Sequence, residues 1–403
     1  MAPVVLMTEH GRGAGPEALM ESVRRVQLSI NRAAATDDRA ARRLPEAVVQ
    51  AVTDSGLLAM KLPRELGGLE TDLGTQVSVI KALAMIDASV AWCVMVGSSA
   101  IAWPAAFLDE TGIGEVFRDR NLPRAAVAVQ PSGRAERVQG GLLVTGRWKL
   151  VSGIHDAEWL VAGVQLIVDS RPRGHHMVVI PAASLTIHDD WTASGLYRSD
   201  SCSVTVEGVY VPLSRTWNFS TDRPRRGGLL SSLGWPAYVT HEMAAFALGI
   251  GQRCVDNLIT MARDDRAIER RELAASECFQ RTIAESRLEL RASEALVLDV
   301  CSSVMRTVQQ SRELSAVEQA EARAVAALAT ERVIQIATNA FRLAGGAALD
   351  DRHGLHCTLQ DILTAGQHWV SRTTALEAFG AEVIKNAPTG DNSEVQIGIT
   401  SVG

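Results

Sequence analysis

The spacing of apolar residues divides the chain into a helical region, a β region and a second helical region. From about residue 17 to residue 122 the apolar positions follow the helical period. Pro45 begins one such run, as is typical of the first position of a helix. Further on, the pattern predicts one long apolar helix from about Gln76 through Asp87 to Ile101. We therefore expect an N-terminal helical domain over residues 1–122.

The middle of the chain has a different pattern. Short segments rich in Val, Ile and Thr are separated by Gly, Pro, Ser or Asp, which predicts an antiparallel β domain over residues 123–222. The last segment, Cys202–Val211, alternates between apolar and other residues as a half-buried strand does. Its phase changes by one residue at Gly208, and this change predicts a β-bulge.

The third region is again helical. After a plausible linker, RPRRGG, the residues from about Pro236 to Lys385 are dominated by Ala, Leu, Glu and Arg. Spacings such as Val325, Leu328 and Ala329 predict four long amphipathic helices. We expect a C-terminal four-helix bundle over residues 223–403, apolar enough to form a subunit interface. The fold class is α+β.

Composition narrows the class of protein. The 403 residues include 40 Lys+Arg and 46 Asp+Glu, which gives a formal net charge of −6, and 47% of the residues are hydrophobic. This is the balance of a globular protein, and we expect no nucleic-acid partner because there is no excess of basic charge. We also expect no membrane partner, because no apolar run reaches about 18 residues. The N-terminus lacks a secretory pattern and the six cysteines form no C-x-x-C pair, so we expect a cytoplasmic protein.

Generic cofactor and metal motifs are weak in this chain. Two G-x-G elements lack the strand–turn–helix context of a dinucleotide-binding motif. His353, His356 and Cys357 have a spacing that could ligate zinc, but no second Cys/His cluster completes four ligands, so we expect no metal. The G-x-S-x-G motif of α/β-hydrolases does not occur.

An ordered set of longer motifs is more informative. It consists of LPEAVVQAVTDSGLLAMKLPRELGG and DASVAW in the first region, VQPSGRAERVQGGLLVTGRWKLVSG and GLYRSDS…VYVP in the second, and FRLAGGAAL…QDILTAGQH in the third. In this order the motifs resemble the acyl-CoA dehydrogenase superfamily, and more closely its branch of two-component flavin-dependent monooxygenases. The resemblance extends from about Leu44 to Gly380 and implies the acyl-CoA dehydrogenase-like fold.

One difference from the dehydrogenases of this superfamily favours the oxygenase branch. Those dehydrogenases commonly carry a glutamate base after the Arg-Asp of a late bundle helix. Here Gln360-Asp361 is followed by ILTAGQHWVSR, which has no glutamate but contains His368. A histidine has an ordinary pKa of about 6.5 and can exchange a proton near neutral pH. The resemblance therefore implies that His368 is the catalytic acid/base.

The resemblance also implies a cofactor. An oxygenase of this branch would receive reduced FMN or FAD from a separate flavin reductase. Molecular oxygen would add at the flavin C4a to give a hydroperoxide, which transfers one oxygen atom in a site that excludes water. Ser152, in the element WxxxSG, would hold the flavin N5 by a hydrogen bond and is the second catalytic candidate.

Further contacts follow from positions in the same motifs. Gln130 and Ser132 would line the isoalloxazine ring, and Gly345 and Gly346 would let the backbone approach the phosphate end. Arg266 would reach the cofactor of a neighbouring subunit in a homotetramer or dimer. The other cofactor candidates are Trp148, Ser199 and Ser201, and the candidate walls of a substrate pocket are Trp92, Trp103 and Tyr197.

The loop at residues 195–201 departs from the family pattern. Relatives often have G-(Leu/Met)-Arg-Gly-Thr-Gly-Ser, whereas this chain has Tyr197 and Asp200 at unusual positions. Two alternatives therefore stay open: an FAD-dependent acyl-CoA dehydrogenase or oxidase, and a non-catalytic member of the fold. Hydroxylation of an aromatic or natural-product substrate, or oxidation of its nitrogen or sulfur, fits the same fold.

Overall fold

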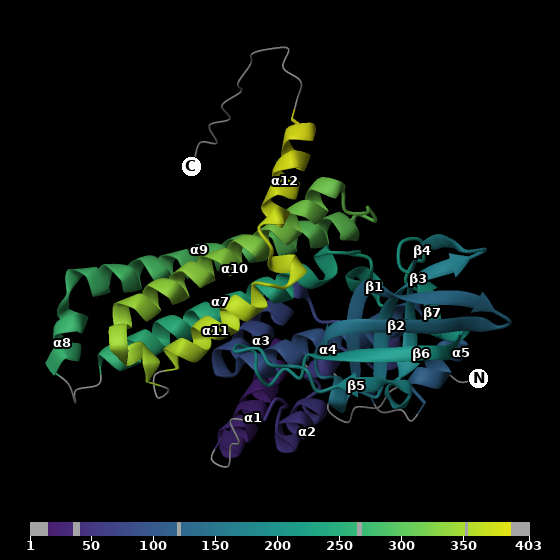
Figure 1. Cartoon of the computed structure of the whole chain (residues 1–403). Helices are drawn as coiled ribbons and strands as arrows, with labels where there is room; N and C mark the ends of the chain where they lie inside the picture. The colour runs from purple at the N-terminus through teal and green to yellow at the C-terminus, as the bar shows by residue number, and fades with distance from the viewer. Residues whose placement is uncertain (1–14, 35–40, 119–121, 264–267, 351–353, 388–403) are drawn as a thin grey trace, which may run out of the picture.

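The computed structural model describes residues 15–34, 41–118, 122–263, 268–350 and 354–387 (Figure 1). The N-terminal region is helical, as predicted. Its helices are α1 (Pro16–Ala34), α2 (Glu46–Asp54), α3 (Leu73–Ile86), α4 (Ala88–Phe107) and α5 (Glu110–Val116).

The prediction of one helix from Gln76 to Ile101 was wrong, because the chain breaks at Asp87. This residue has an extended backbone (φ −149°, ψ 121°), and its side chain accepts a hydrogen bond from the Val90 N–H. Asp87 is therefore the N-cap of α4, a position at which aspartate stabilises the first turn of a helix. By length and composition α4 could cross a membrane, but 78% of its apolar window is buried inside the protein. Its apolar character is that of a core helix.

The β region forms one seven-stranded sheet with the order β5-β6-β2-β1-β3-β4-β7. The strands are β1 (Ala125–Val138), β2 (Gly141–Val151), β3 (Trp159–Val168), β4 (Arg171–Pro181), β5 (Thr186–His188), β6 (Cys202–Pro212) and β7 (Thr216–Asn218). The sheet is mixed rather than antiparallel, because β1 and β3 are parallel. After β2 a short connection containing η3 (Ile154–Asp156) crosses to the free edge of β1, so β3 starts at the same end of the sheet as β1.

The predicted bulge in β6 is confirmed. The pairing of β2 with β6 shifts between Val144 and Gly146, opposite Gly208. Gly208 has a φ of +61°, a conformation that favours glycine, and its N–H bonds to Thr145 Oγ1 at 2.9 Å.

The third region is helical, as predicted. Its helices are α6 (Gly228–Ser231), α7 (Ala237–Ala262), α8 (Ile268–Ala275), α9 (Glu277–Gln309), α10 (Ala316–Ala344), η6 (Gly345–Leu349), α11 (Leu355–Ala365), η8 (Trp369–Ser371) and α12 (Thr374–Lys385). Among the described residues, however, three helices are long rather than four, and α11 and α12 have only 11 and 12 residues. A capping box at Ser315 and Glu318 starts α10. In Figure 1, α7, α9, α10 and α11 lie side by side, and α3 lies against this bundle.

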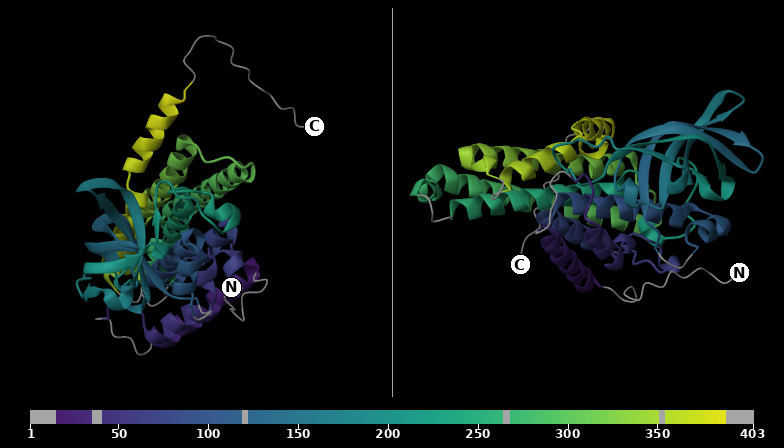
Figure 2. Two further views of the ribbon diagram at one scale, coloured as in Figure 1. Left: turned by 90° about the vertical axis from the view of Figure 1, so that its right-hand side faces the viewer. Right: turned by 60° about the horizontal axis from the view of Figure 1, so that its bottom comes forward.

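The three regions form one molecule with the sheet packed against the helices (Figure 2). One large apolar cluster joins the N-terminal helices, the bundle and the sheet residues Val161, Met177 and Val179. A second cluster, which includes Trp148, belongs to the β region. Trp148 is 1% exposed, and its indole N–H donates to the Gly163 carbonyl at 2.8 Å.

The fit around Trp148 leads to a test of this packing. A Cβ placed on Gly133 would overlap Cζ2 of the Trp148 ring, which cannot move because it is buried and hydrogen-bonded. We expect Gly133→Ala to lower the free energy of unfolding by about 1–3 kcal/mol. Thermal unfolding followed by circular dichroism measures this change.

Gly114→Ala is the matched control, because Gly114 lies in α5 and a Cβ there meets nothing within 4 Å. This control is expected to retain or slightly raise the parent melting temperature, since alanine favours a helix. Equal melting temperatures for the Gly133 variant and the parent would contradict the described packing.

Candidate functional site

A cavity of about 540 Å³ lies between the sheet and the helices. One wall is made by β1 and β2 and the residues that follow β2, and the opposite wall by α4 and α7. The segment from Gln367 to Arg372, after α11, completes the lining. Of the predicted residues, the cavity wall includes Gln130, Ser132, Trp148, Ser152, Trp103 and His368.

The strand wall presents polar groups because β1 is irregular there. Its pairing with β3 shifts between Ala128 and Gly133, and its pairing with β2 starts only at Gly133. Gln130 and Ser132 lie in this interval and are exposed. Their side chains are therefore available to a ligand.

A chain of buried hydroxyl groups lies behind Ser152. The Trp92 indole N–H donates to Ser152 Oγ at 3.0 Å. Ser152 Oγ is 2.8 Å from Ser201 Oγ, which is 2.7 Å from Ser199 Oγ. Because the indole can only donate, Ser152 accepts there and can direct its own proton either to Ser201 or into the cavity. Trp92, Ser199 and Ser201 therefore orient Ser152 from behind the wall and are outside the cavity lining.

The loop that carries Ser199 and Ser201 is held at both ends. A Cβ on Gly195 would overlap the Gln360 carbonyl, so the loop approaches α11 closely. The Leu196 N–H donates to Asp361 Oδ1 at 2.7 Å. Burial raises the pKa of Asp361 to about 6, even though the Leu196 N–H bond acts in the opposite direction. The loop and α11 are thus joined by a desolvated carboxyl group.

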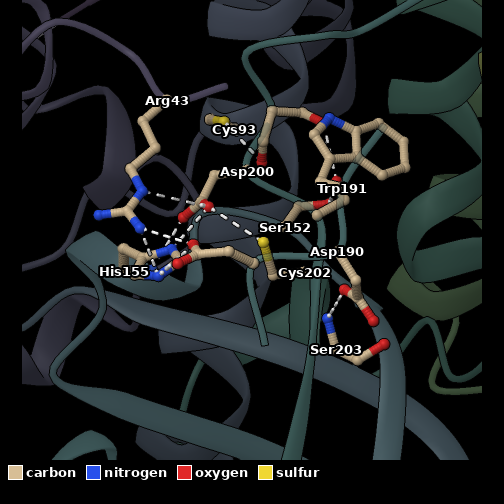
Figure 3. A network of polar contacts seen from close by, with 12 residues as sticks. Arg43, Cys93, Ser152, His155, Asp190, Trp191, Asp200, Cys202 and Ser203 are labelled. Carbon is tan, nitrogen blue, oxygen red and sulfur yellow. Dashed lines mark hydrogen bonds and ion pairs between the residues drawn. The ribbon is translucent and has the colours of Figure 1, made fainter. Parts of the chain in front are cut away.

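At its other end the loop is held by Asp200, whose position in the sequence was unusual. Figure 3 shows Asp200 and Arg43 around His155. Asp200 accepts hydrogen bonds from the His155 N–H at 2.8 Å and from the His155 ring Nδ1 at 2.7 Å. Asp200 has a φ of +49°, so these bonds stabilise a conformation that is unfavourable for most residues. Its role in this chain is to anchor the loop.

Among the described residues, His155, Asp189 and Cys202 place their ligand atoms within 4.8 Å of one another. The Arg43 guanidinium bonds to His155 Nε2 at 2.6 Å and to Asp189 at 2.8 Å. The positive charge of Arg43 would repel a metal cation at this place, so this group is better explained as a bridge between residues far apart in the sequence.

His368 lies between α11 and η8. Its Nδ1 accepts a hydrogen bond from the Val370 N–H at 3.4 Å, so the neutral ring carries its proton on Nε2. The ring meets the edge of Trp92 at a centroid distance of 5.7 Å. Burial, with a smaller effect of the Arg372 charge, lowers the pKa of His368 to about 4. At neutral pH the ring is therefore uncharged and has an N–H group at Nε2.

Two further predictions do not fit the cavity of a single chain. Tyr197 is half-buried outside the cavity lining, with its ring 5.1 Å from the Arg198 guanidinium. It is therefore not a wall of this cavity, because the loop docks on α11 through Gly195 and Leu196 and contacts Ser152 through Ser201.

Gly345 and Gly346 follow the C-terminal end of α10. Thr330, farther back on α10, lies 3.4 Å from Ser371, so the glycines are about 20 Å along the helix from the cavity segment. A Cβ on either would meet nothing within 4 Å. The two glycines therefore lie away from the cavity of this chain. Arg266 lies outside the described residues.

The sequence analysis missed the part of the cavity wall built by α7. Glu242 borders the cavity, and its Oε2 accepts a hydrogen bond from Lys61 Nζ at 2.7 Å. Both side chains are fully buried. The sequence does contain a signal for this pair, because each residue is an isolated charge in an apolar run: Lys61 in GLLAMKL and Glu242 in HEMAAFALGIG. Trp235 and Trp369 also line the cavity and stack on each other at a centroid distance of 4.9 Å.

Comparison with known proteins agrees with this architecture. The family model of the acyl-CoA dehydrogenase N-terminal domain matches residues 16–111, and that of the C-terminal domain matches residues 242–373. Together they cover more than half of the chain. The chain belongs to the acyl-CoA dehydrogenase superfamily. The predicted fold class is thereby confirmed.

The relatives with known activities are monooxygenases. The chain is 27% identical over 336 residues to the oxygenase subunit HsaA of a flavin-dependent monooxygenase from Mycobacterium tuberculosis, covering 80% of this chain and 83% of the relative. It is 27% identical over 292 residues to indole-3-acetate monooxygenase from Pseudomonas putida, covering 70% and 71%. The chain is an enzyme, as predicted, and it is similar to these flavin-dependent monooxygenases over most of its length.

Solved structures show the same fold. The crystal structure of HsaA from M. tuberculosis has a TM-score of 0.83 at 23% identity, and the match covers 94% of this chain and 99% of that one. XiaF from Streptomyces sp., solved in complex with FADH2 and glycerol, has a TM-score of 0.81 at 23% identity, with coverage of 94% and 98%.

The buried link between α11 and the loop leads to a prediction about pH. In the folded protein Asp361 has a pKa of about 6, above its ordinary value of 3.8, so the folded state holds the proton more tightly than the unfolded state. Stability is therefore lost as the pH rises from about 4 to about 6. Asp361→Asn keeps an acceptor oxygen but does not titrate. We expect its free energy of unfolding to rise by up to about 3 kcal/mol relative to that of the parent over this interval.

Urea unfolding at a series of pH values measures this difference. Asp361→Ala should show the same dependence of stability on pH as Asp361→Asn. Its stability should be lower at every pH, because the Leu196 N–H loses its acceptor. Parallel pH profiles for the parent and Asp361→Asn would show that Asp361 does not titrate in this way.

Proposed function

We propose that the cavity binds reduced FMN or FAD, delivered by a separate flavin reductase, and that the enzyme transfers one oxygen atom from O₂ to an aromatic substrate. The second oxygen atom leaves as water, and the flavin is oxidised. The single observation that carries this proposal is that Ser152 and His368, distant in sequence, border one cavity with Gln130 and Ser132. We expect the enzyme to act in the cytoplasm.

The residues present suit a flavin. The cavity volume, about 540 Å³, lies within the range of small-molecule and cofactor sites. Polar groups on the strand wall, Gln130 and Ser132, can bond the edge of a planar ring, and Ser152 offers a hydroxyl group that is already oriented. Lys149 and Arg372, two exposed cations that border the cavity, can contribute to binding a phosphate group. When bound, reduced flavin supplies the electron pair that activates O₂ at its C4a carbon.

The chain itself supplies proton control and the exclusion of water. The neutral His368 ring, with its proton on Nε2, can donate that proton or a hydrogen bond to a reacting group, and the same atom can take a proton back afterwards. Its low pKa is caused mainly by burial, and a negative charge bound nearby would raise it toward neutrality. Apolar residues on the helical wall, such as Met95, Val96 and Met243, limit the access of water to the reacting atoms.

The walls also suit an aromatic substrate. Trp103, Trp235 and Trp369 border the cavity in a row, with centroid distances of 5.2 Å and 4.9 Å between neighbours. Stacked and tilted aromatic side chains favour planar ligands. A second cavity of about 690 Å³ shares Trp103 and Trp235 with the first.

We also propose that the enzyme is a homotetramer or dimer. Leu288 and Leu298 on α9 are 65% and 38% exposed, and Val383 and Ile384 on α12 are 48% and 78% exposed. Exposed apolar residues on two helices of the bundle are typical of subunit contacts. A second copy could bring Gly345, Gly346 or Arg266 to the cofactor.

Anaerobic titration with flavin tests the proposed cofactor. We expect reduced flavin to bind at least about tenfold more tightly than oxidised flavin, because a cofactor delivered by another protein must be retained in its reduced form. Ser152→Ala is expected to weaken binding, since it removes the hydroxyl group at the cavity wall. Tightly bound FAD that an acyl thioester reduces would instead identify a dehydrogenase, and failure to bind either form of flavin would indicate a non-catalytic protein.

Substitution of His368 tests the proposed acid/base. His368→Ala should lower product formation by about 10²–10⁴-fold, because proton transfer by a positioned side chain is lost. The control is His356→Ala, which removes an exposed histidine of α11. Product and hydrogen peroxide are measured together in the presence of a flavin reductase, NADH and O₂. Unchanged turnover and unchanged coupling in His368→Ala would remove His368 from the mechanism.

A further inference from the structure

The helical wall of the cavity contains one carboxylate. On this wall Glu242 lies among Val96, Trp103, Val239 and Met243, and the Ser99 hydroxyl is beside it. The Glu242 side chain is fully buried. A carboxylate in such surroundings needs hydrogen-bond donors for both of its oxygen atoms.

Only one of these oxygen atoms has its donors. Oε2 accepts hydrogen bonds from Lys61 Nζ at 2.7 Å and from Ser99 Oγ at 3.4 Å. Oε1 has no hydrogen-bond partner among the described residues. The Ser98 hydroxyl is close enough to Glu242 to act on its pKa, in the lowering direction, but it donates its hydrogen bond to the Met95 carbonyl at 3.0 Å. The wall therefore contains a buried acceptor that no described residue satisfies.

Lys61 cannot turn to satisfy Oε1. Its Nζ donates to Glu242 Oε2, to the Tyr238 carbonyl at 2.7 Å and to Ser99 Oγ at 3.0 Å. An ammonium group has three protons, and all three are used. Because only the charged form can donate three bonds, this geometry is that of an ammonium paired with a carboxylate. Lys61 is outside the cavity lining, whereas Glu242 and Ser99 belong to it, so the lysine holds the carboxylate from behind.

We propose that Glu242 is a substrate-recognition residue whose Oε1 accepts a hydrogen bond from an O–H or N–H group on an aromatic substrate. The aromatic body would lie along Trp103 and Trp235, which are 5.2 Å apart and border the same cavity. A phenol, an aniline or an indole has this combination of a planar apolar body and one donor. An anionic group at this end of the cavity is excluded, because it would be repelled by the carboxylate. This inference rests on the proposed function for its identification of the ligand as the substrate.

Binding of paired probes tests the assignment without turnover or flavin. Phenol is compared with anisole, and indole with 1-methylindole, since methylation removes the donor and keeps the ring. Isothermal titration calorimetry of the parent protein should give at least about tenfold tighter binding of each donor-bearing member, as expected for a hydrogen bond to a charged group.

The variants are designed so that they retain the fold. Removal of Glu242 alone would leave Lys61 buried and uncompensated, whereas replacing both members of a buried ion pair is often tolerated. In Lys61→Met with Glu242→Leu, the preference for the donor-bearing probes should disappear. In Lys61→Met with Glu242→Gln, the amide oxygen can still accept, so part of the preference should return. Gln367→Ala, which changes an exposed polar residue of the cavity lining away from Glu242, should keep the full preference.

Three results would overturn the assignment: equal affinities within each probe pair in the parent, an unchanged preference in the leucine variant, or no measurable binding of any probe. Flavin titration and product assays on the parent are separate measurements. A donor preference without flavin binding would retain the recognition site and reject the proposed oxygenase function. Oxygenase activity without a donor preference would reject the recognition site and retain the proposed oxygenase function.

Discussion

The site depends on the close contact between α11 and the loop at residues 195–201. Gly195 lies against the Gln360 carbonyl, and the Leu196 N–H bonds to the buried carboxyl group of Asp361. The loop then carries Ser201, which contacts Ser152 across the cavity wall. The same helix ends shortly before His368. One helix therefore positions both candidate catalytic residues, His368 directly and Ser152 through the loop.

Desolvation governs the chemistry that the cavity can perform. Burial lowers the pKa of His368 and of Lys61, and it raises the pKa of Glu242 and of Asp361. Each of these groups has a fixed partner, which limits the cost of burial. The result is a cavity in which protons are held at defined atoms and water has limited access. Oxygen transfer requires both conditions, because activated oxygen in contact with water is lost as peroxide.

The sequence predicted the features that depend on local pattern or on family motifs. The three regions, the bulge at Gly208, and the positions of Gln130, Ser132, Ser152 and His368 in one cavity follow from periodicity or from motif order. The break at Asp87 was missed because a capping aspartate inside an apolar run has no effect on periodicity. The parallel pairing of β1 with β3 was missed because it depends on which edge of β1 the chain reaches after β2.

The least predictable features are contacts between segments far apart in the chain. Lys61 and Glu242 are 181 residues apart in the sequence. They meet because α7 and the 3-10 helix just before Lys61 (Leu57–Ala59) both pack against α4. Asp200 is unusual in the loop pattern, yet its bonds to His155 explain it. Tyr197 had the right residue type for a pocket wall, but the docking of the loop leaves it outside the cavity. Residue type and order alone do not determine these contacts.

The most direct test of the account is the fate of isotopically labelled O₂ in a reaction with a flavin reductase, NADH, FMN or FAD, and phenol or indole. Mass spectrometry of the product should show one labelled oxygen atom per molecule, formed only when the enzyme and the reductase are both present. A product that takes its oxygen from water, or the formation of hydrogen peroxide with no oxygenated product, would contradict the claim that this cavity transfers oxygen from O₂ to an aromatic substrate.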